Sequence, residues 1–373
     1  METKNNPKIN WLFFVAIVAG ITARLLVATR GHNFDVDSWR IVADVVERGG
    51  NVYAETGRYN YGPVWFQVLH VLDWLAGHNP AVFRYIVAGF LSLVDVGIFY
   101  ILWRKYGRLA AGLFFFNPIS IIITGYHSQF DNLAILLGLL AAWLVGDEFD
   151  RPLDRRKLLG LSVLGLSLAT KHLLFAFPFW LAVKQRGLWQ KAGIILLPIG
   201  LFLLSFAPYW PGGRAGIINH VFLYQSATNG YFYNLFVPLC LQFMFSSQAI
   251  WFFLLAVFAF VWRRKNTFES LLLYTAVLVT ASPAVVNQYL AIPVPFVATH
   301  FNVFTLLYTA FGTLHLLVDV NGLHMTGLSR TVFIDIAICL LCLGLVWVTW
   351  RRNIMDLIEW CVVEIKGQFG GMK

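Results

Sequence analysis

Charged side chains are scarce in this sequence. They make up 13% of the 373 residues, whereas 58% are hydrophobic, and a soluble domain usually carries about 25% charge. Apolar runs long enough to cross a bilayer core of roughly 30 Å recur along the chain. The composition therefore excludes an ordinary soluble domain and predicts an all-α polytopic membrane protein. The first run, "WLFFVAIVAGITARLLVA", lacks a small-residue cleavage site, so we interpret it as a retained anchor.

Cysteine is scarce as well. The four cysteines show no paired spacing, and Cys339 and Cys342 share one face of an apolar run. This pattern supports neither a disulfide framework nor a zinc site. The net charge of +9 comes from Lys and Arg in short loops between apolar runs, which is the positive-inside pattern of membrane proteins. We therefore expect membrane lipids, and no nucleic acid, as partners.

The basic clusters predict the topology. If all of them are cytoplasmic, the apolar runs pair up between them as about twelve transmembrane helices, some of them short or re-entrant. The predicted helices cover about 11–28, 82–103, 109–125, 131–146, two short helices within 157–186 that turn near Lys171, 192–210, 244–262, 268–283, 285–302, 303–318 and 331–350.

One apolar segment is too short to span. "PVWFQVLHVLDWLAG" has about fifteen residues and reaches ~22 Å as a helix, and Gln67, His70 and Asp73 recur on one of its faces. We interpret it as an interfacial helix along the membrane surface. The single domain 1–373 would then have extracytoplasmic loops over 29–80 and 211–243 and a cytoplasmic tail over 351–373.

This topology brings the informative polar side chains to the outer face. Carboxylates and amides bind sugar hydroxyls, aromatic faces stack on sugar rings, and cations at membrane depth suit a lipid phosphate. The candidate residues are Asp35, Asp37, Tyr61, His127, Gln129, Asp131, Lys171, His172, Arg214, Gln288 and Tyr289.

Each candidate also has a structural alternative. Asp35 or Asp37 could cap the helix that follows them. Lys171 lies within an apolar run and could snorkel toward water instead of binding an anion. His127 could serve only to hydrogen-bond a neighbouring loop. Asp95, in the middle of a predicted helix, is favoured as a neutral or paired packing residue.

Several short motifs, in order along nearly the whole chain, carry a resemblance. They are "FDVDSWRIVADVVERGGNVYAETGRYNYGPVW", "FNPISIIITGYHSQFDNLAILL", "LATKHLLFAFPFWL" and "NQYLAIPVPF". Together they resemble the GT-C glycosyltransferases, integral membrane enzymes that take a sugar from a polyprenyl phosphate. The first motif is similar to the first external loop of mannosyltransferases in that family. His127 and Ala291 depart from the usual residues at their positions, which bears on the sugar more than on the fold.

The resemblance implies a GT-C-like fold and an enzyme that transfers a hexose, mannose by the closest motifs, with inversion. Asp35 aligns with the acidic residue that acts as general base, and Asp37 is the second acid. We expect Lys171, helped by His172 and Arg214, to bind the phosphate of a polyprenyl-phosphate-linked donor, and the acceptor to be a lipid or glycan outside the cytoplasm. We expect no essential metal and no cofactor, because cationic side chains can neutralise a monophosphate without the divalent cation that a D-x-D pair can bind.

The short loops favour a prokaryotic plasma membrane over the endoplasmic reticulum. The alternatives are a secondary transporter of a polar or lipid-linked solute and a non-catalytic membrane scaffold or lipid-binding subunit.

Overall fold

The computed structural model of the chain describes residues 11–149, 152–224, 234, 237–238, 242, 244–320 and 332–351. Within these ranges the chain is helical and contains no strand. The first half contains α1 (Trp11–Ala28), α2 (Phe34–Glu47), α3 (Val52–Glu55), α4 (Pro63–Leu75), α5 (Pro80–Tyr106), α6 (Arg108–Phe115), α7 (Pro118–Ile122), the π-helical turn η1 (Ile123–His127), α8 (Asp131–Val145), α9 (Arg155–Thr170), the 3-10 turn η2 (His172–Leu174) and α10 (Phe177–Ala182). The second half contains α11 (Leu188–Leu204), η3 (Ala207–Tyr209), α12 (Trp210–Gly216), η4 (Ile217–Phe222), α15 (Ser247–Val261), α16 (Thr267–Thr280), η5 (Asn287–Ala291), α17 (Val294–Thr299), α18 (Val303–Val320) and a last helix over Val332–Arg351.

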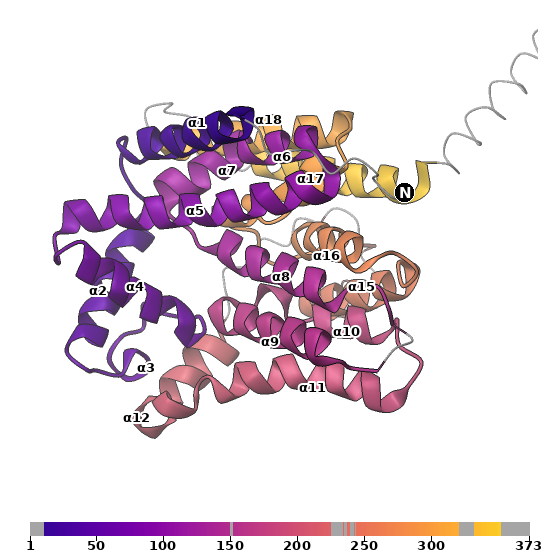
Figure 1. Ribbon diagram of the computed structural model, residues 1–373, viewed down its shortest axis with the longest axis horizontal. Helices are drawn as coiled ribbons and strands as arrows, with labels where there is room; N and C mark the ends of the chain where they lie inside the picture. The colour runs from indigo at the N-terminus through magenta and orange to yellow at the C-terminus, as the bar shows by residue number, and fades with distance from the viewer. Residues whose placement is uncertain are drawn as a thin grey trace, which may run out of the picture.

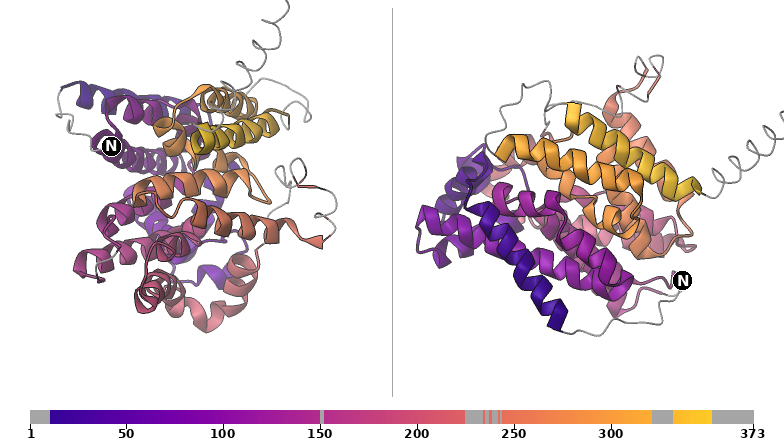
Figure 2. Two further views of the ribbon diagram at one scale, coloured as in Figure 1. Left: turned by 90° about the vertical axis from the view of Figure 1, so that its right-hand side faces the viewer. Right: turned by 90° about the horizontal axis from the view of Figure 1, so that it is seen from above.

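The long helices run roughly side by side, and the short helices gather at one end. In Figure 1 the long helices cross the picture, whereas α2, α3, α4 and α12 lie together at its left. Contacts of α2 with α4 and of α3 with α12 hold this group together. Figure 2 shows α18 and the last helix side by side at the far end of the colour scale, and the Phe311 and Phe333 rings approach to 6.2 Å between them.

Among the residues that the structure describes, four helical runs are long and apolar enough to cross a membrane. They are α1, α5, the run Leu188–Phe222 and Val332–Arg351, and a fifth results if α6 and α7–η1, which are bent by 44°, form one span. The apolar helices α8, α15, α16 and α18 are shorter or have shorter apolar stretches. These lengths are compatible with a membrane protein, and the count of twelve spans stays a prediction. The loop predicted over 211–243 lies largely outside the described residues, as does the tail beyond 351.

Two predicted helices are broken in the structure. The run over about 109–125 is bent between α6 and α7, at Pro118. The run over about 285–302 forms η5 and then α17, with Pro293 and Pro295 at the break. Proline lacks the N–H that a helix interior needs and its ring clashes with the preceding turn. By contrast, α1 covers the residues that its apolar run predicts, and α9 ends at the predicted turn beside Lys171.

A buried ion pair joins the first helices. The Arg24 Nε donates to Asp95 Oδ2 at 2.8 Å, and both side chains are fully buried. Asp95 also accepts hydrogen bonds from Thr124 and Asn132, at 2.7 and 2.6 Å, while Arg24 Nη1 donates to the Phe115 carbonyl at 2.9 Å. The pair therefore links α1, α5, η1, α8 and the end of α6, and Asp95 is the paired packing residue that was favoured above.

The two ends of α8 and α9 differ in character. One end carries the Asp131 and Lys171 pair, and the other lies near Asp147, whose carboxylate accepts from the Thr267 backbone N–H at 2.6 Å. At that second end Lys184 donates to the carbonyl of Arg263 and to Ser270 Oγ. One end of α8 and α9 is therefore rich in Lys, Arg and acidic groups. The opposite end of these helices holds most of the candidate residues.

The segment predicted as an interfacial helix forms α4, but the polar face of this helix is not uniformly exposed. Asp73 is only 3% exposed and its carboxylate bonds to His78 at 2.7 Å. The exposed side chains at the end of α4 are Val71, Trp74 and Leu75. Burial of Asp73 follows from the packing of α4 against α2, α5 and α9.

Candidate functional site

A cavity of about 190 Å³ collects side chains from five separate segments of the chain. Its lining residues are Asn60, Tyr61, Lys171, His172, Leu173, Phe175, Tyr224, Trp251, Leu278, Val279, Ser282, Val286, Gln288, Tyr289 and Ile292. Five of the candidate residues, which are spread over more than 200 positions of the chain, therefore line one space: Tyr61, Lys171, His172, Gln288 and Tyr289.

Lys171 is the cation of this cavity. It is 3% exposed, and its Nζ donates to Asp131 Oδ2 at 2.7 Å. The same Nζ lies 4.9 Å from the ring centroids of both Tyr61 and Phe130, where the faces of aromatic rings attract a cation. The ammonium is therefore paired and enclosed, and it does not snorkel.

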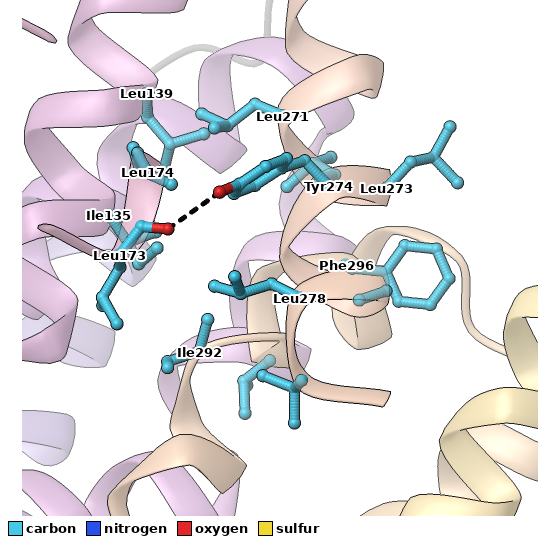
Figure 3. Close-up of a cluster of buried hydrophobic side chains, with 14 of the residues drawn as sticks. Ile135, Leu139, Leu173, Leu174, Leu271, Leu273, Tyr274, Leu278, Ile292 and Phe296 are labelled. Atoms are coloured by element: carbon cyan, nitrogen blue, oxygen red, sulfur yellow. Dashed lines mark hydrogen bonds between the residues drawn. The ribbon is translucent and has the colours of Figure 1, made fainter. Parts of the chain in front are cut away.

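A side chain of α16 holds the backbone around Lys171 in place. Helix α9 ends at Thr170, and Lys171 has extended dihedral angles before the short turn η2. The Tyr274 hydroxyl donates to the Leu173 carbonyl at 2.9 Å, as Figure 3 shows, and it accepts from the Ala176 N–H at 3.3 Å. Because this segment lies between α9 and α10 and forms only a short 3-10 turn, the tyrosine satisfies backbone groups that would otherwise be buried alone.

Asp35 lies at the first turn of α2, but it does not cap that helix. The cap is Asn33, whose side-chain oxygen accepts from the Asp35 N–H, so the capping alternative for Asp35 and Asp37 is wrong. The half-buried Asp35 carboxylate instead accepts a hydrogen bond of 2.5 Å from Gln129 Nε2. Asn33 also shares a hydrogen bond of 2.8 Å with His127 Nδ1. Asp35 is thus joined to the turn that carries Gln129 and Asp131.

That turn has an unusual backbone. Residues Ile123–His127 form a π-helical turn, and Ser128 follows in the left-handed region at φ 51°. Non-glycine residues rarely adopt this conformation, and such strain often accompanies functional sites. Its effect here is to turn Gln129 toward Asp35 and to start α8 at Asp131, with both side chains almost completely buried.

Asp35 also acts on the cavity through its charge. Burial raises the pKa of the Tyr61 phenol well above its usual value, and the neighbouring carboxylates of Asp35 and Asp131 raise it further. Tyr61 therefore stays uncharged, and both carboxylates lie within electrostatic reach of a residue that lines the cavity.

Two predicted residues lie elsewhere. Asp37 is 61% exposed and its carboxylate contacts His32 Nε2 at 3.1 Å, with Arg84 on the other nitrogen of that ring at 3.3 Å. Arg214 is exposed on α12, with its guanidinium over the Trp210 ring at 5.8 Å. Neither residue lines the cavity. The two acids of the D-x-D pair separate because α2 is helical from Phe34, so alternate residues point in different directions.

His172 is uncharged at neutral pH. Burial, and then the neighbouring Lys171 ammonium, lower its pKa to about 4. The prediction that it helps Lys171 as a second cation is therefore revised: the neutral ring can only share a hydrogen bond with a ligand.

This shift predicts a pH dependence of stability. An unfolded histidine takes up its proton near pH 6.5, whereas folded His172 stays neutral down to about pH 4. We therefore expect the free energy of unfolding to fall as the pH drops from about 6.5 to about 4, by on the order of 3 kcal/mol. Thermal unfolding in detergent should show this slope, and His172→Gln should flatten it; an unchanged slope in the variant would assign it to other groups.

The contact between Gly62 and α9 gives a second prediction. A Cβ on Gly62 would lie 2.0 Å from the Ala169 carbonyl oxygen, so Gly62→Ala must push apart the segments that carry Tyr61 and Lys171. We expect the melting temperature to fall, and binding of the lipid phosphate predicted from the sequence to weaken at least about tenfold. Gly89→Ala, where nothing lies within 4 Å of the added carbon, is the matched control. Wild-type binding by the Gly62 variant would contradict the predicted coupling.

Several residues of the cavity carry no signal in the sequence. Trp251, Leu278 and Ile292 are apolar residues of apolar runs, and only the packing of α15, α16 and η5 brings them to Lys171. Asn60 lies within the first motif, between Tyr59 and Tyr61, but nothing in the sequence assigned it to the cavity. The polar residues of such a cavity can therefore be predicted from a sequence, but the apolar residues that line it cannot.

Comparison with known proteins gives no relative for this arrangement. No protein-family model, no curated protein and no solved structure matches the chain.

Proposed function

We propose that the chain is an inverting glycosyltransferase that moves a hexose, mannose by its closest motifs, from a polyprenyl-phosphate donor to a lipid or glycan acceptor. The observation that carries the proposal is the composition of the cavity. Its lining includes Lys171, Asn60 and Gln288 together with Trp251, Leu278 and further apolar residues. A cavity that combines a cation with an apolar wall suits an amphiphilic anion such as a lipid phosphate.

The proposed chemistry uses residues of this cavity and its border. The acceptor hydroxyl attacks the anomeric carbon from the face opposite the phosphate, and Asp35 takes up the hydroxyl proton. The bond between the anomeric carbon and the phosphate oxygen breaks, and its electron pair leaves with the phosphate. Lys171 stabilises the phosphate charge. The leaving group is already ionised, so no second carboxyl group is needed as an acid, in contrast to glycoside hydrolysis.

The remaining side chains have supporting roles in this proposal. Gln129 orients the Asp35 carboxylate through their hydrogen bond. Tyr61 and Tyr289 offer aromatic faces to a sugar ring, and the Gln288 amide can bind its hydroxyls. Asp37 and Arg214, which lie away from the cavity, have no part in the chemistry.

The proposed orientation places the cavity at the outer face of a prokaryotic plasma membrane. Its support is the separation of charge between the two ends of α8 and α9: the end with Lys184, Lys265 and the other basic residues would be cytoplasmic. The count of twelve crossings belongs to this proposal.

The test is a transfer assay with the purified full-length chain in lipid nanodiscs. Radiolabelled polyprenyl-phosphate mannose, glucose and arabinose are offered with candidate lipid acceptors, and we expect label to move to an acceptor with one of the donors. In sealed vesicles, label that crosses the membrane on an intact solute would favour the transporter. Neither transfer nor binding with any donor would overturn the proposed function.

A further inference from the structure

We propose that an apolar groove between α6, α17 and α18 binds one anionic phospholipid of the cytoplasmic leaflet. The lipid phosphate would lie against Arg108, and one acyl chain would fill the groove. This site is separate from the cavity around Lys171, because the two share no lining residue. The inference goes beyond the proposed function and does not depend on it.

The groove lies beside the break between α6 and α7. These two segments are bent by 44°, and a space of about 320 Å³ separates α6 from the end of α17 and the start of α18. Figure 1 shows the three helices together, and α17 packs on α6 while α18 packs on α7. Gly112 keeps the α6 wall of the groove flat, because a Cβ at this position would meet nothing within 4 Å. The space is therefore open to an elongated ligand.

The lining of the groove suits a hydrocarbon chain. Its exposed apolar side chains are Leu109, Phe116, Phe301 and Leu306. The polar side chains of the lining already have partners: Asn117 Nδ2 donates to Thr309 Oγ1 at 3.3 Å, and Asn117 Oδ1 accepts from the Ile119 N–H at 3.0 Å. The groove thus offers a ligand apolar contact and few free hydrogen-bonding groups, which favours an acyl chain over a sugar or an extended peptide.

One end of the groove carries a positive charge. Among the described residues that line it, Arg108 is the only charged one, and no acidic side chain is present. Its exposed guanidinium lies 5.5 Å from the centroid of the Trp103 ring. Arg104 and Lys105 precede it in the last turn of α5 but do not line the groove. A guanidinium binds a phosphate through parallel N–H bonds, and basic pockets between transmembrane helices on the cytoplasmic side bind anionic lipid head groups.

The spacing along α6 matches the depth of one lipid leaflet. The groove follows the chain from Arg108 to Phe116, which is about 12 Å at a rise of 1.5 Å per residue, most of one leaflet in a bilayer core of roughly 30 Å. The positive-inside pattern assigns the Arg108 cluster to the cytoplasmic surface. A lipid whose phosphate contacts Arg108 would therefore have its acyl chain at the depth of the exposed apolar side chains.

The test uses photoactivatable lipids on the full-length chain in phosphatidylcholine nanodiscs. Phosphatidylglycerol and phosphatidylcholine probes, with the same diazirine on the same acyl chain, are added separately at equal mole fraction. Labelled peptides are then identified by mass spectrometry. We expect at least about fivefold more label on residues 109–116 from the anionic probe, a preference that one basic side chain near the membrane surface can provide. Residues 196–204 of α11, which contain exposed leucines and no charge, should be labelled equally by both probes.

Two results would overturn the inference at this stage. Equal labelling of residues 109–116 by the two probes would remove the role of charge. A groove that neither probe labels would have another occupant, such as the residues beyond 351 or a second copy of the chain.

Variants separate the head-group contact from the acyl-chain contact. Arg108→Gln should abolish the preference for the anionic probe, whereas Arg155→Gln, at an exposed arginine of α9, should preserve it. Gly112→Leu places a side chain in the groove and should lower the label from both probes severalfold. Gly200→Leu on α11, where a Cβ also meets nothing within 4 Å, is its control.

The variants can also contradict the inference. A retained preference in Arg108→Gln, or undiminished groove labelling in a folded Gly112→Leu, would do so. If Gly112→Leu does not fold, the comparison of the two probes on the wild-type chain and on Arg108→Gln decides the question.

Discussion

Asp35→Asn should lower the rate of sugar transfer at least about a hundredfold, because a positioned general base typically contributes that much or more. An asparagine keeps the size of the side chain. It can still form a hydrogen bond with the Gln129 amide, because each of the two amides has both a donor and an acceptor. Donor binding should change little, since the phosphate is held by Lys171. The measurements are single-turnover transfer with saturating donor and, separately, binding of the donor.

Two further variants of α2 serve as references. Asp44→Asn changes an exposed carboxylate on the same helix and should leave transfer unchanged. Asp37→Asn tests the other acid of the D-x-D pair, and we expect near-normal transfer because its carboxylate contacts His32 and solvent. An inactive Asp37→Asn beside an active Asp35→Asn would assign the base to Asp37 and contradict the structural argument.

Arg24→Met should destabilise the protein by roughly 3–5 kcal/mol, the usual cost of removing one partner of a buried ion pair. The substitution leaves the Asp95 carboxylate buried without its cation, and it leaves the Phe115 carbonyl without the donor at the break between α6 and α7. Thermal unfolding in detergent measures the effect.

A second substitution shows how much of this loss is charge. Arg24→Met with Asp95→Asn removes both charges and keeps an acceptor for Thr124, so the double variant should recover a substantial part of the stability. Arg155→Met, at an exposed arginine in the first turn of α9, should be neutral. A double variant as unstable as Arg24→Met alone would show that hydrogen bonds, and not the unpaired charge, account for the loss.

The sequence predicted local features well because local physics determines them. The apolar run at 11–28 forms α1, and the turn before Lys171 follows from a run too long for one helix and bounded by basic residues. The prediction of one helix over 285–302 is wrong because it gave the apolar composition more weight than Pro293 and Pro295, which break the helix.

Pairings across long stretches of sequence could not be predicted. Arg24 and Asp95 are 71 positions apart, and nothing in either helix specifies the other as a partner. The candidate list contained Lys171 and Asp131, but it assigned Lys171 to a ligand and not to Asp131. Likewise, the position of Arg214 in a polar outer loop suggested a phosphate ligand, and only the fold shows that α12 packs on α3 and carries the arginine away from the cavity.

The break between α6 and α7 has a consequence for biogenesis. A bent segment of this kind exposes backbone carbonyls and amides that lipid cannot hydrogen-bond, and here the Phe115 carbonyl receives its donor from α1. The nascent segment over 108–127 should therefore be a poor substrate for independent insertion and should depend on earlier helices to leave the translocon. Truncated chains that lack α1 are expected to stall or be degraded at this point, even though the segment is apolar enough to insert by composition.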